Sequence, residues 1–236
     1  MTRIGCLILV VCFLASAAYG QTVNALPSTV STFPQAVDGT LSDGSYWGTI
    51  LWVENTGTST ATCTLKGPLS ARFGQPNFLV PVNYKTEVLS KTTDALQSGI
   101  VQLSCDQPML SSLTYISFLP NGVASGMATV LPARAVSVAA MSIIPIGQFG
   151  IAIANITAST LILDVRFNRS NGQVVTGTIT VPPASQYVKF VHEILNISPT
   201  DDGVFIVTNF QSAVPFYIMG LMFKGTAFTT LVPSGS

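Results

Sequence analysis

The sequence predicts an all-β protein of two tandem antiparallel β-sandwich domains that follow a cleaved signal peptide. Composition is the first observation behind this prediction, because Thr, Ser, Val and Gly are abundant while only 8% of residues are charged. The second is a series of short apolar strands, about seven per hundred residues, separated by turn signals. The third is an internal match, because residues 203–233 repeat the first glycine, a glutamine and the closing proline of residues 99–132.

Residues 1–20 form the predicted signal peptide. Arg3 supplies the positive charge, an apolar run follows, and Ala18-Tyr19-Gly20 provides the small residues of a cleavage site, so we expect the mature chain to begin at Gln21. The alternative is a membrane anchor, although the apolar run is shorter than the roughly 20 residues that a spanning helix needs. We therefore expect a mature chain without a transmembrane segment that is secreted, periplasmic or at the cell surface.

The first domain is expected over residues 21–133. It opens with Phe33-Pro34-Gln35, and a long apolar strand over residues 46–54 ends at the turn Asn55-Thr56-Gly57. A threonine-rich strand and a polar loop come next. The expected strands after the turn cover residues 58–65, 78–82, 86–90, 99–105, 110–118 and 124–131.

Cys63 and Cys105 are the two cysteines of the mature chain. Cys63 alternates with Ala61 and Leu65, and Cys105 alternates with Val101 and Leu103, so both thiols are expected to point inward from strands. Two cysteines in an oxidising compartment usually pair, which predicts a disulfide across the two sheets. The alternative is a pair of buried free thiols.

The second domain is expected over residues 134–236, after a short linker near Ala133. It repeats the order of the first domain, with Asn155-Ile156-Thr157 in the place of the earlier asparagine turn. Leu163 and Asn209 stand where the first domain has its cysteines, so this domain depends on packing alone. A single helical turn is expected around residues 191–194. The expected strands cover residues 149–154, 161–167, 174–181, 203–209, 213–223 and 226–232.

Three segments resemble a module of secreted bacterial proteins: FPQAVDG, WVENTGTSTATCTL and GIVQLSCDQPM. The second half, with GIAIANIT, FVHEIL and MGLMFKGTAFTTLVP, is similar to the partner module that commonly follows it. The resemblance covers nearly the whole mature chain and implies tandem β-sandwich (Ig-like) modules of a family without an assigned activity. Its motifs are turn glycines and strand ends, so it implies no site residue. Cys105 departs from the pattern, where Asp or Ser-like residues are more common.

The balance of charge excludes several classes of partner. The chain has 10 Lys and Arg against 10 Asp and Glu, so it offers no basic face for nucleic acid and no polybasic patch for a membrane surface. No cofactor motif was found, and we expect neither a cofactor nor a resident metal. The remaining partner classes are an unknown protein and a polysaccharide.

His192 is the single histidine, so a histidine-dependent enzyme would have to use it as the catalytic base. A catalytic triad would need it as base, with Glu193 or Asp164 to orient it, yet no G-x-S-x-G turn presents a serine. One histidine with two bridged cysteines also falls short of the ligands that zinc needs. We expect a solvated or capping histidine and a protein that is not an enzyme.

Acidic residues beside glycines leave calcium as an alternative. Asp38 and Asp43 lie in one loop, and Asp201-Asp202-Gly203 lie in another. The spacing is not that of an EF-hand, and Asp-Gly pairs are ordinary in turns. Whether either loop binds calcium stays open at this point.

Aromatic residues are the remaining candidates for binding. Tyr46, Trp47 and Trp52 belong to one predicted strand, where alternation places the two tryptophans on opposite faces. One tryptophan is expected in the core, and the other is a possible ligand contact. We expect a secreted, non-catalytic β-sandwich protein with a structural or protein-interaction role. The alternative is a carbohydrate-binding or adhesion module that uses these aromatic side chains.

Overall fold

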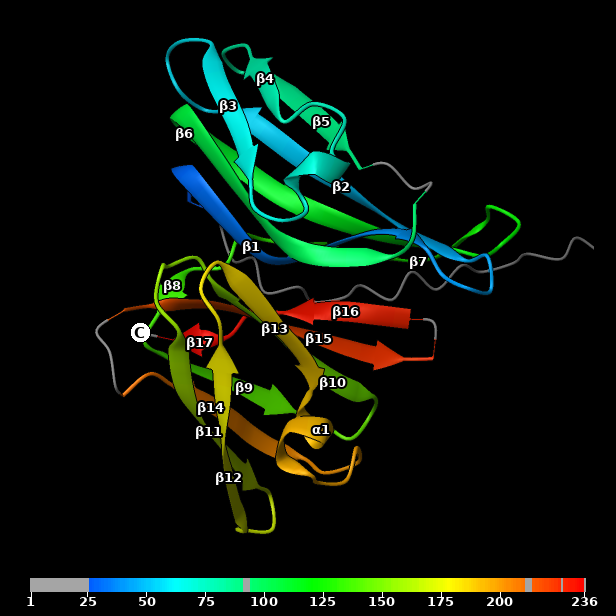
Figure 1. Cartoon of the computed structure of the whole chain (residues 1–236), viewed down its shortest axis with the longest axis vertical. Helices are drawn as coiled ribbons and strands as arrows, with labels where there is room; N and C mark the ends of the chain where they lie inside the picture. Colours follow the sequence, from blue (N-terminus) through cyan, green and yellow to red (C-terminus); the bar gives the residue numbers. More distant parts are fainter. Residues whose placement is uncertain (1–25, 91–93, 211–213, 226, 236) are drawn as a thin grey trace, which may run out of the picture.

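The computed structural model describes residues 26–90, 94–210, 214–225 and 227–235 (Figure 1). Strands dominate this part of the chain, and its one α-helix, α1 (Val191–Leu195), has five residues, which confirms the all-β class and the predicted helical turn. The predicted signal peptide, residues 1–20, lies outside the described residues. Within the described residues, no helix is long and apolar enough to span a bilayer.

The first half of the molecule, residues 26–133, forms one seven-stranded sheet that folds into two layers. Its inward residues, such as Leu51, Leu65 and Leu103, share one buried core. The elements are β1 (Ser28–Thr40), β2 (Tyr46–Asn55), β3 (Ala61–Lys66), the 3-10 helix η1 (Ser70–Arg72), β4 (Asn77–Val80), β5 (Lys85–Leu89), β6 (Gln97–Phe118) and β7 (Ala124–Val130).

Strand β6 belongs to both layers. Its first part pairs with β1 and β3, and its last part, residues 109–118, pairs with β2. One layer therefore has the order β4-β3-β6-β1 and the other has the order β5-β2-β6-β7. The expectation of two separate strands, 99–105 and 110–118, is wrong, because residues 106–108 stay extended and continue the strand. Proline is compatible with such an extended backbone, so Pro108 does not end the strand.

The second half, residues 134–235, has two five-stranded sheets around a second core. One sheet has the order β13-β10-β15-β16 with β8 beside β15, and the other has the order β12-β11-β14-β9-β17. The strands are β8 (Ala135–Val136), β9 (Val138–Ile143), β10 (Gln148–Asn155), β11 (Leu161–Arg169), β12 (Val174–Val181), β13 (Ser185–Phe190), β14 (Gly203–Thr208), β15 (Phe216–Lys224), β16 (Ala227–Leu231) and β17 (Ser234–Gly235).

The strand orders of the two halves correspond. The order β13-β10-β15-β16 matches β5-β2-β6-β7, and β12-β11-β14-β9 matches β4-β3-β6-β1. Asn55 and Asn155 align the two halves residue by residue. Both are buried, and each is the last residue of its strand, β2 or β10. Each donates its side-chain amide to backbone carbonyls, at Ser59 and Val80 or at Ser159 and Val181.

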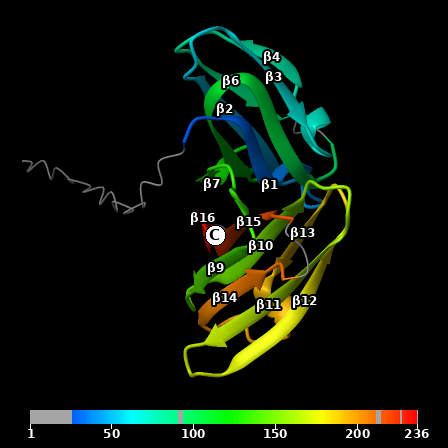
Figure 2. The same ribbon diagram turned by 90° about the vertical axis from the view of Figure 1, so that its left-hand side faces the viewer.

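The two halves stack against each other, as both views show (Figures 1 and 2). The first core includes Ala152, Met219 and Leu221 of the second half. Strand β10 is buried at every position from Phe149 to Asn155, because one of its faces meets its own core and the other meets the first half. The sheet β13-β10-β15-β16 is thus an internal layer of the molecule.

The predicted disulfide between Cys63 and Cys105 is confirmed, and its placement is corrected. The two residues are directly opposite each other on the paired strands β3 and β6, with their Cα atoms 4.2 Å apart. The bridge therefore joins neighbouring strands of one layer and does not cross between layers. Alternation predicts that a side chain points inward, but it does not tell which strand is the neighbour.

Candidate functional site

The aromatic residues of β2 divide between two faces of its sheet. Trp47 lies on the inner face with Leu51 and Val53, and its ring packs against Phe228 of the second half with 5.1 Å between centroids. Tyr46 and Trp52 lie on the opposite face, and both are half-buried. The predicted split of the tryptophans is thus present, although neither ring is fully buried in the core.

The face that carries Tyr46 and Trp52 continues across three neighbouring strands. Tyr46 is opposite Phe118 on β6, and their rings stack with centroids 4.4 Å apart. Ile116 follows on β6 and is opposite Met127 on β7, whose side chain is 68% exposed. We call this surface the outer face; its apolar members are Tyr46, Ile50, Trp52, Leu89, Ile116, Phe118 and Met127.

Polar groups surround Trp52 on the outer face. Its indole N–H donates to Thr114 Oγ1 at 3.2 Å, and the Thr114 and Thr129 hydroxyls are 2.9 Å apart. The Lys85 ammonium lies 4.6 Å from the centroid of the ring, which is within the range of a cation–π contact. Ser112 stands directly opposite Trp52 on β6. The outer face therefore combines flat apolar rings with hydroxyl groups and one cation.

The equivalent face of the second half has different residues and a different environment. With Asn155 aligned on Asn55, Ala152 takes the place of Trp52, and the strand pairing then places Met219 in the position of Ser112. Ala152 and Met219 are buried against the first half. The same type of face is thus an internal contact in one half and a solvent-facing surface in the other.

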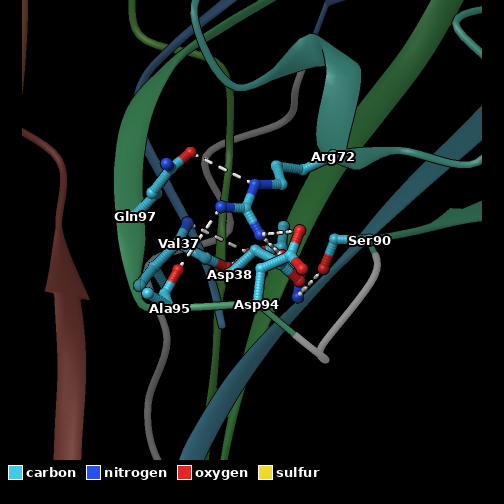
Figure 3. A network of polar contacts seen from close by, with 8 residues as sticks. Val37, Asp38, Arg72, Ser90, Asp94, Ala95 and Gln97 are labelled. Carbon is cyan, nitrogen blue, oxygen red and sulfur yellow. Dashed lines mark hydrogen bonds and ion pairs between the residues drawn. The ribbon is translucent and has the colours of Figure 1, made fainter. Parts of the chain in front are cut away.

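A second candidate site is a network of polar contacts around Arg72 (Figure 3). The Arg72 guanidinium reaches Asp94 at 2.8 Å and the buried carboxylate of Asp38 at 3.5 Å. Its remaining nitrogens contact the Gln97 side chain and the Ala95 carbonyl. Arg72 thereby connects η1, the end of β1 and the segment before β6.

Asp38 is the buried acid of this network. Burial raises the pKa of its carboxyl, although the nearby Ser90 hydroxyl and the Arg72 charge act in the opposite direction. Its Oδ1 atom has no hydrogen-bond partner among the described residues. The next residue, Gly39, has a φ of 119°, and a side chain there would collide with the Ala95 carbonyl. The Asp-Gly pair thus has a structural role in closing the sheet around Arg72.

The other acids considered for calcium each have a nearby protein partner. Asp43 accepts from the backbone and hydroxyl of Ser45, Asp201 pairs with Arg169 at 2.8 Å, and Asp202 accepts from Ser170. Among the described residues, no group of three or more His, Cys, Asp or Glu side chains is placed to hold a metal ion.

His192 lies in the first turn of α1, where its ring stacks on Phe190 with 5.5 Å between centroids. The Glu193 carboxylate accepts from the Phe190 backbone N–H, so it caps the helix. The His192 carbonyl accepts from the backbone of Ile197. The His192 side chain is thus half-buried against Phe190, and the contact at the helix end comes from its backbone, so the expected solvated or capping side chain is replaced by a packed one. Glu193 caps the helix and is not placed as an orienting partner of His192.

A groove of about 800 Å³ lies between the two halves. Arg134 is the charged residue among its described lining residues, so the groove has no pair of acidic and basic groups for proton transfer. Its apolar lining includes Leu26, Val30, Val130, Val136, Tyr217 and Val232.

Sequence reasoning found part of the outer face. It identified Tyr46 and Trp52, but it missed Phe118, Ile116 and Met127, because those residues lie on strands whose pairing with β2 is not apparent from local patterns. Alternation from Ser112 to Phe118 could have predicted that the even-numbered residues, Ile116 and Phe118 among them, share one face of their strand.

Comparisons with known proteins assign no family to this chain. No family model matches the chain, and no match was found among curated proteins or among solved structures.

Proposed function

We propose that this chain is an exported, non-catalytic interaction protein of two tandem Ig-like sandwich modules, and that the outer face of its first half is the binding surface. The contrast between two equivalent faces carries this proposal. The face around Ala152 is buried, whereas the outer face exposes Met127 beside half-buried aromatic rings. Exposed apolar patches with aromatic residues and a polar surround are typical of protein interfaces.

A photo-crosslinking experiment tests the binding surface. A photoreactive amino acid replaces Met127 in the exported protein, and a matched variant carries it at Val174, an exposed position of the second half. We expect protein adducts from position 127 that excess wild-type chain suppresses, and none from position 174. Equal adducts from both positions, or none from position 127, would contradict the proposal.

Export is a separate part of the proposal. The disulfide is compatible with an oxidising compartment, and the N-terminal sequence supports cleavage after Gly20. N-terminal sequencing of the exported protein should begin at Gln21. A chain that retains Met1 in the cell envelope would contradict cleavage.

A polysaccharide ligand is the second candidate, and the surroundings of Trp52 favour it. An aromatic ring beside Ser112, Thr114 and Lys85 offers stacking together with hydrogen bonds. The Trp47→Phe variant leaves Trp52 as the single tryptophan and reports on this site alone. Saturable changes of its fluorescence on addition of a polysaccharide would favour this candidate over a protein partner.

A further inference from the structure

Strand β1 has an open edge near its start. On one side, its residues from Ser28 to Thr32 pair with β6. On the other side, the described residues contribute a single bridge to this segment, in which the Thr32 carbonyl accepts from the Ala133 N–H. Val30 lies two residues earlier, so its backbone groups point to the same side. Its N–H and C=O bind the Ser28 hydroxyl, at 3.2 and 2.7 Å, and not a neighbouring strand.

The equivalent edge of the second half carries a strand of the same chain. Strand β9 corresponds to β1, and Ala140 stands where the first half has Thr32, because the two residues pair with equivalent positions of β14 and β6. The C-terminal β17 runs along β9, with Ser234 opposite Ala140 and Gly235 opposite Ala139. This edge of the fold is therefore suited to accept an added strand.

The first half begins the same cover and then gives it up. Ala133 pairs with Thr32 in the place that Ser234 takes on β9, but the next residue, Arg134, leads into β8, which pairs with β15. This departure leaves space beside the open edge. The groove of about 800 Å³ lies there, and the residues of β1 and its approach that line it are Leu26, Pro27, Ser28, Val30 and Ser31.

The lining of the groove favours an apolar peptide with an acidic group. Leu26, Val30 and Val232 line it and are 71%, 47% and 56% exposed. Arg134 is its charged lining residue, and none of the ion pairs between described residues involves it. Such a guanidinium is a good partner for a carboxylate. An added strand gains affinity from main-chain hydrogen bonds and specificity from its alternate side chains.

We propose that an extended segment of a partner protein binds in this groove and adds to β1 as a further strand. Its backbone pairs with Val30 in place of the Ser28 hydroxyl, its alternate apolar side chains contact Leu26 and Val232, and an acidic side chain pairs with Arg134. The groove and the outer face share no residue. The groove is therefore a second interaction surface, and it binds whether or not the outer face has a partner.

Peptide selection tests this site. Panning a phage-displayed library of random heptapeptides against the exported chain should enrich sequences with apolar residues at alternate positions and one Asp or Glu. In fluorescence polarisation, Val30→Pro should weaken binding of the selected peptide by about tenfold or more, because proline lacks the N–H and obstructs the edge. Val30→Thr keeps the N–H and is the matched control, with an affinity within about twofold of the wild type. Since the Val30 N–H binds Ser28 and not β6, both variants should unfold at the wild-type urea concentration.

Arg134→Glu gives a second measurement that leaves the backbone of β1 unchanged. Panning this variant should enrich Lys or Arg where the wild type selects Asp or Glu, whereas Met127→Glu, on the outer face, should select the same peptides as the wild type. Selection of no peptide, or equal binding of the selected peptide to Val30→Pro and Val30→Thr, would overturn the proposal. Displacement of the selected peptide by a synthetic peptide of residues 21–25 would also overturn it, because the groove would then belong to the chain's own N-terminal segment.

Discussion

At the scale of single residues, the buried asparagines explain how the long second strand of each half ends. The Asn155 amide donates to the Ser159 and Val181 carbonyls, and its Oδ1 accepts from Thr157. Such a residue satisfies backbone groups that would otherwise be buried without a partner. Asn155-Ile156-Thr157 also has the Asn-x-Thr pattern of a glycosylation acceptor, but the fully buried Asn155 side chain leaves no access to it in the folded chain.

Replacing this asparagine should be costly. Asn155→Ala leaves buried carbonyls without donors, so we expect the free energy of unfolding to fall by about 1–3 kcal/mol. Asn55→Ala should cost a similar amount, because its contacts are equivalent. Asn77→Ala, at an exposed position, is the control and should change stability by less than about 0.5 kcal/mol in urea titrations. Equal effects of all three substitutions would contradict this role.

Asp38 gives the stability a dependence on pH. Its pKa is raised in the folded state from the ordinary 3.8, so the folded protein holds this proton more tightly than the unfolded chain does. The contribution of protonated Asp38 to the free energy of unfolding is therefore fully present below about pH 4, and it is lost as pH rises through the pKa of the folded state. Asp38→Asn lacks this loss, and its stability relative to the wild type should improve from about pH 4 to pH 7.

Asp43 provides a control of opposite sign. The backbone and hydroxyl of Ser45 lower the pKa of its carboxyl, so its contribution is present above the ordinary pKa and is lost as pH falls. Asp43→Asn should therefore lose stability relative to the wild type as pH rises through the acid range up to about pH 4, and the difference should stay nearly constant above it. Parallel pH profiles of the two variants would argue against the opposite pKa shifts.

At the scale of elements, the correspondence of strands predicts where a second disulfide can be built. Strands β11 and β14 pair Val165 with Val207 and Asp164 with Thr208, so the next residues in this register are Leu163 and Asn209. These two positions correspond to Cys63 and Cys105 of the first half. We expect the double substitution Leu163→Cys with Asn209→Cys to form this bridge, as measured by counting free thiols with and without reductant. Two additional free thiols after oxidation would show that the registers of the two halves differ.

The existing bridge offers the matching measurement. It closes a loop with a sequence separation of 42 residues, for which the chain-entropy model gives about 3–4 kcal/mol of stabilisation. Replacing Cys63 and Cys105 together by Ala should lower the free energy of unfolding by an amount near this range. A loss below about 1 kcal/mol would mean that packing around β3 and β6 holds these strands without the bridge.

Local patterns predicted much of the fold and less of the candidate site. Alternation and turns were sufficient for strands such as β12 (Val174–Val181) and for the helical turn at α1, because these features depend on neighbours in sequence. The continuity of β6 and the pairing of Cys63 with Cys105 within one layer depend on contacts between distant segments. The outer face depends on both local patterns and distant contacts. Trp52 could be identified from its own strand, whereas Met127 joins the face only through the pairing of β7 with β6.

At the scale of the whole molecule, the two halves share part of a core, and we expect residues at this contact to couple their stability. Met219 belongs to the second half, yet it is buried in the core of the first. Met219→Ala should cost about 2–5 kcal/mol because it leaves a cavity at this contact. We expect faster hydrogen exchange in β1 (Ser28–Thr40) as well as in β15, measured by mass spectrometry.

A core substitution on the far side of the second half is the control. Val207 is fully buried in the second core and has no part in the first. Val207→Ala should therefore accelerate exchange mainly within the second half. If Met219→Ala leaves the exchange of β1 unchanged, the two halves unfold independently and the shared core has no energetic consequence.

The path of β6 has a consequence for the order of folding events in the first half. Cys105 lies just before the point where this strand passes from β3 to β2, so oxidation with Cys63 can set the hydrogen-bonding register of the first stretch. The remaining residues up to Phe118 can then join β2 only in the alignment that this register allows. Oxidation thus favours one alignment of β6 in the first half, whereas a reduced chain must reach the same alignment through packing and hydrogen bonds alone.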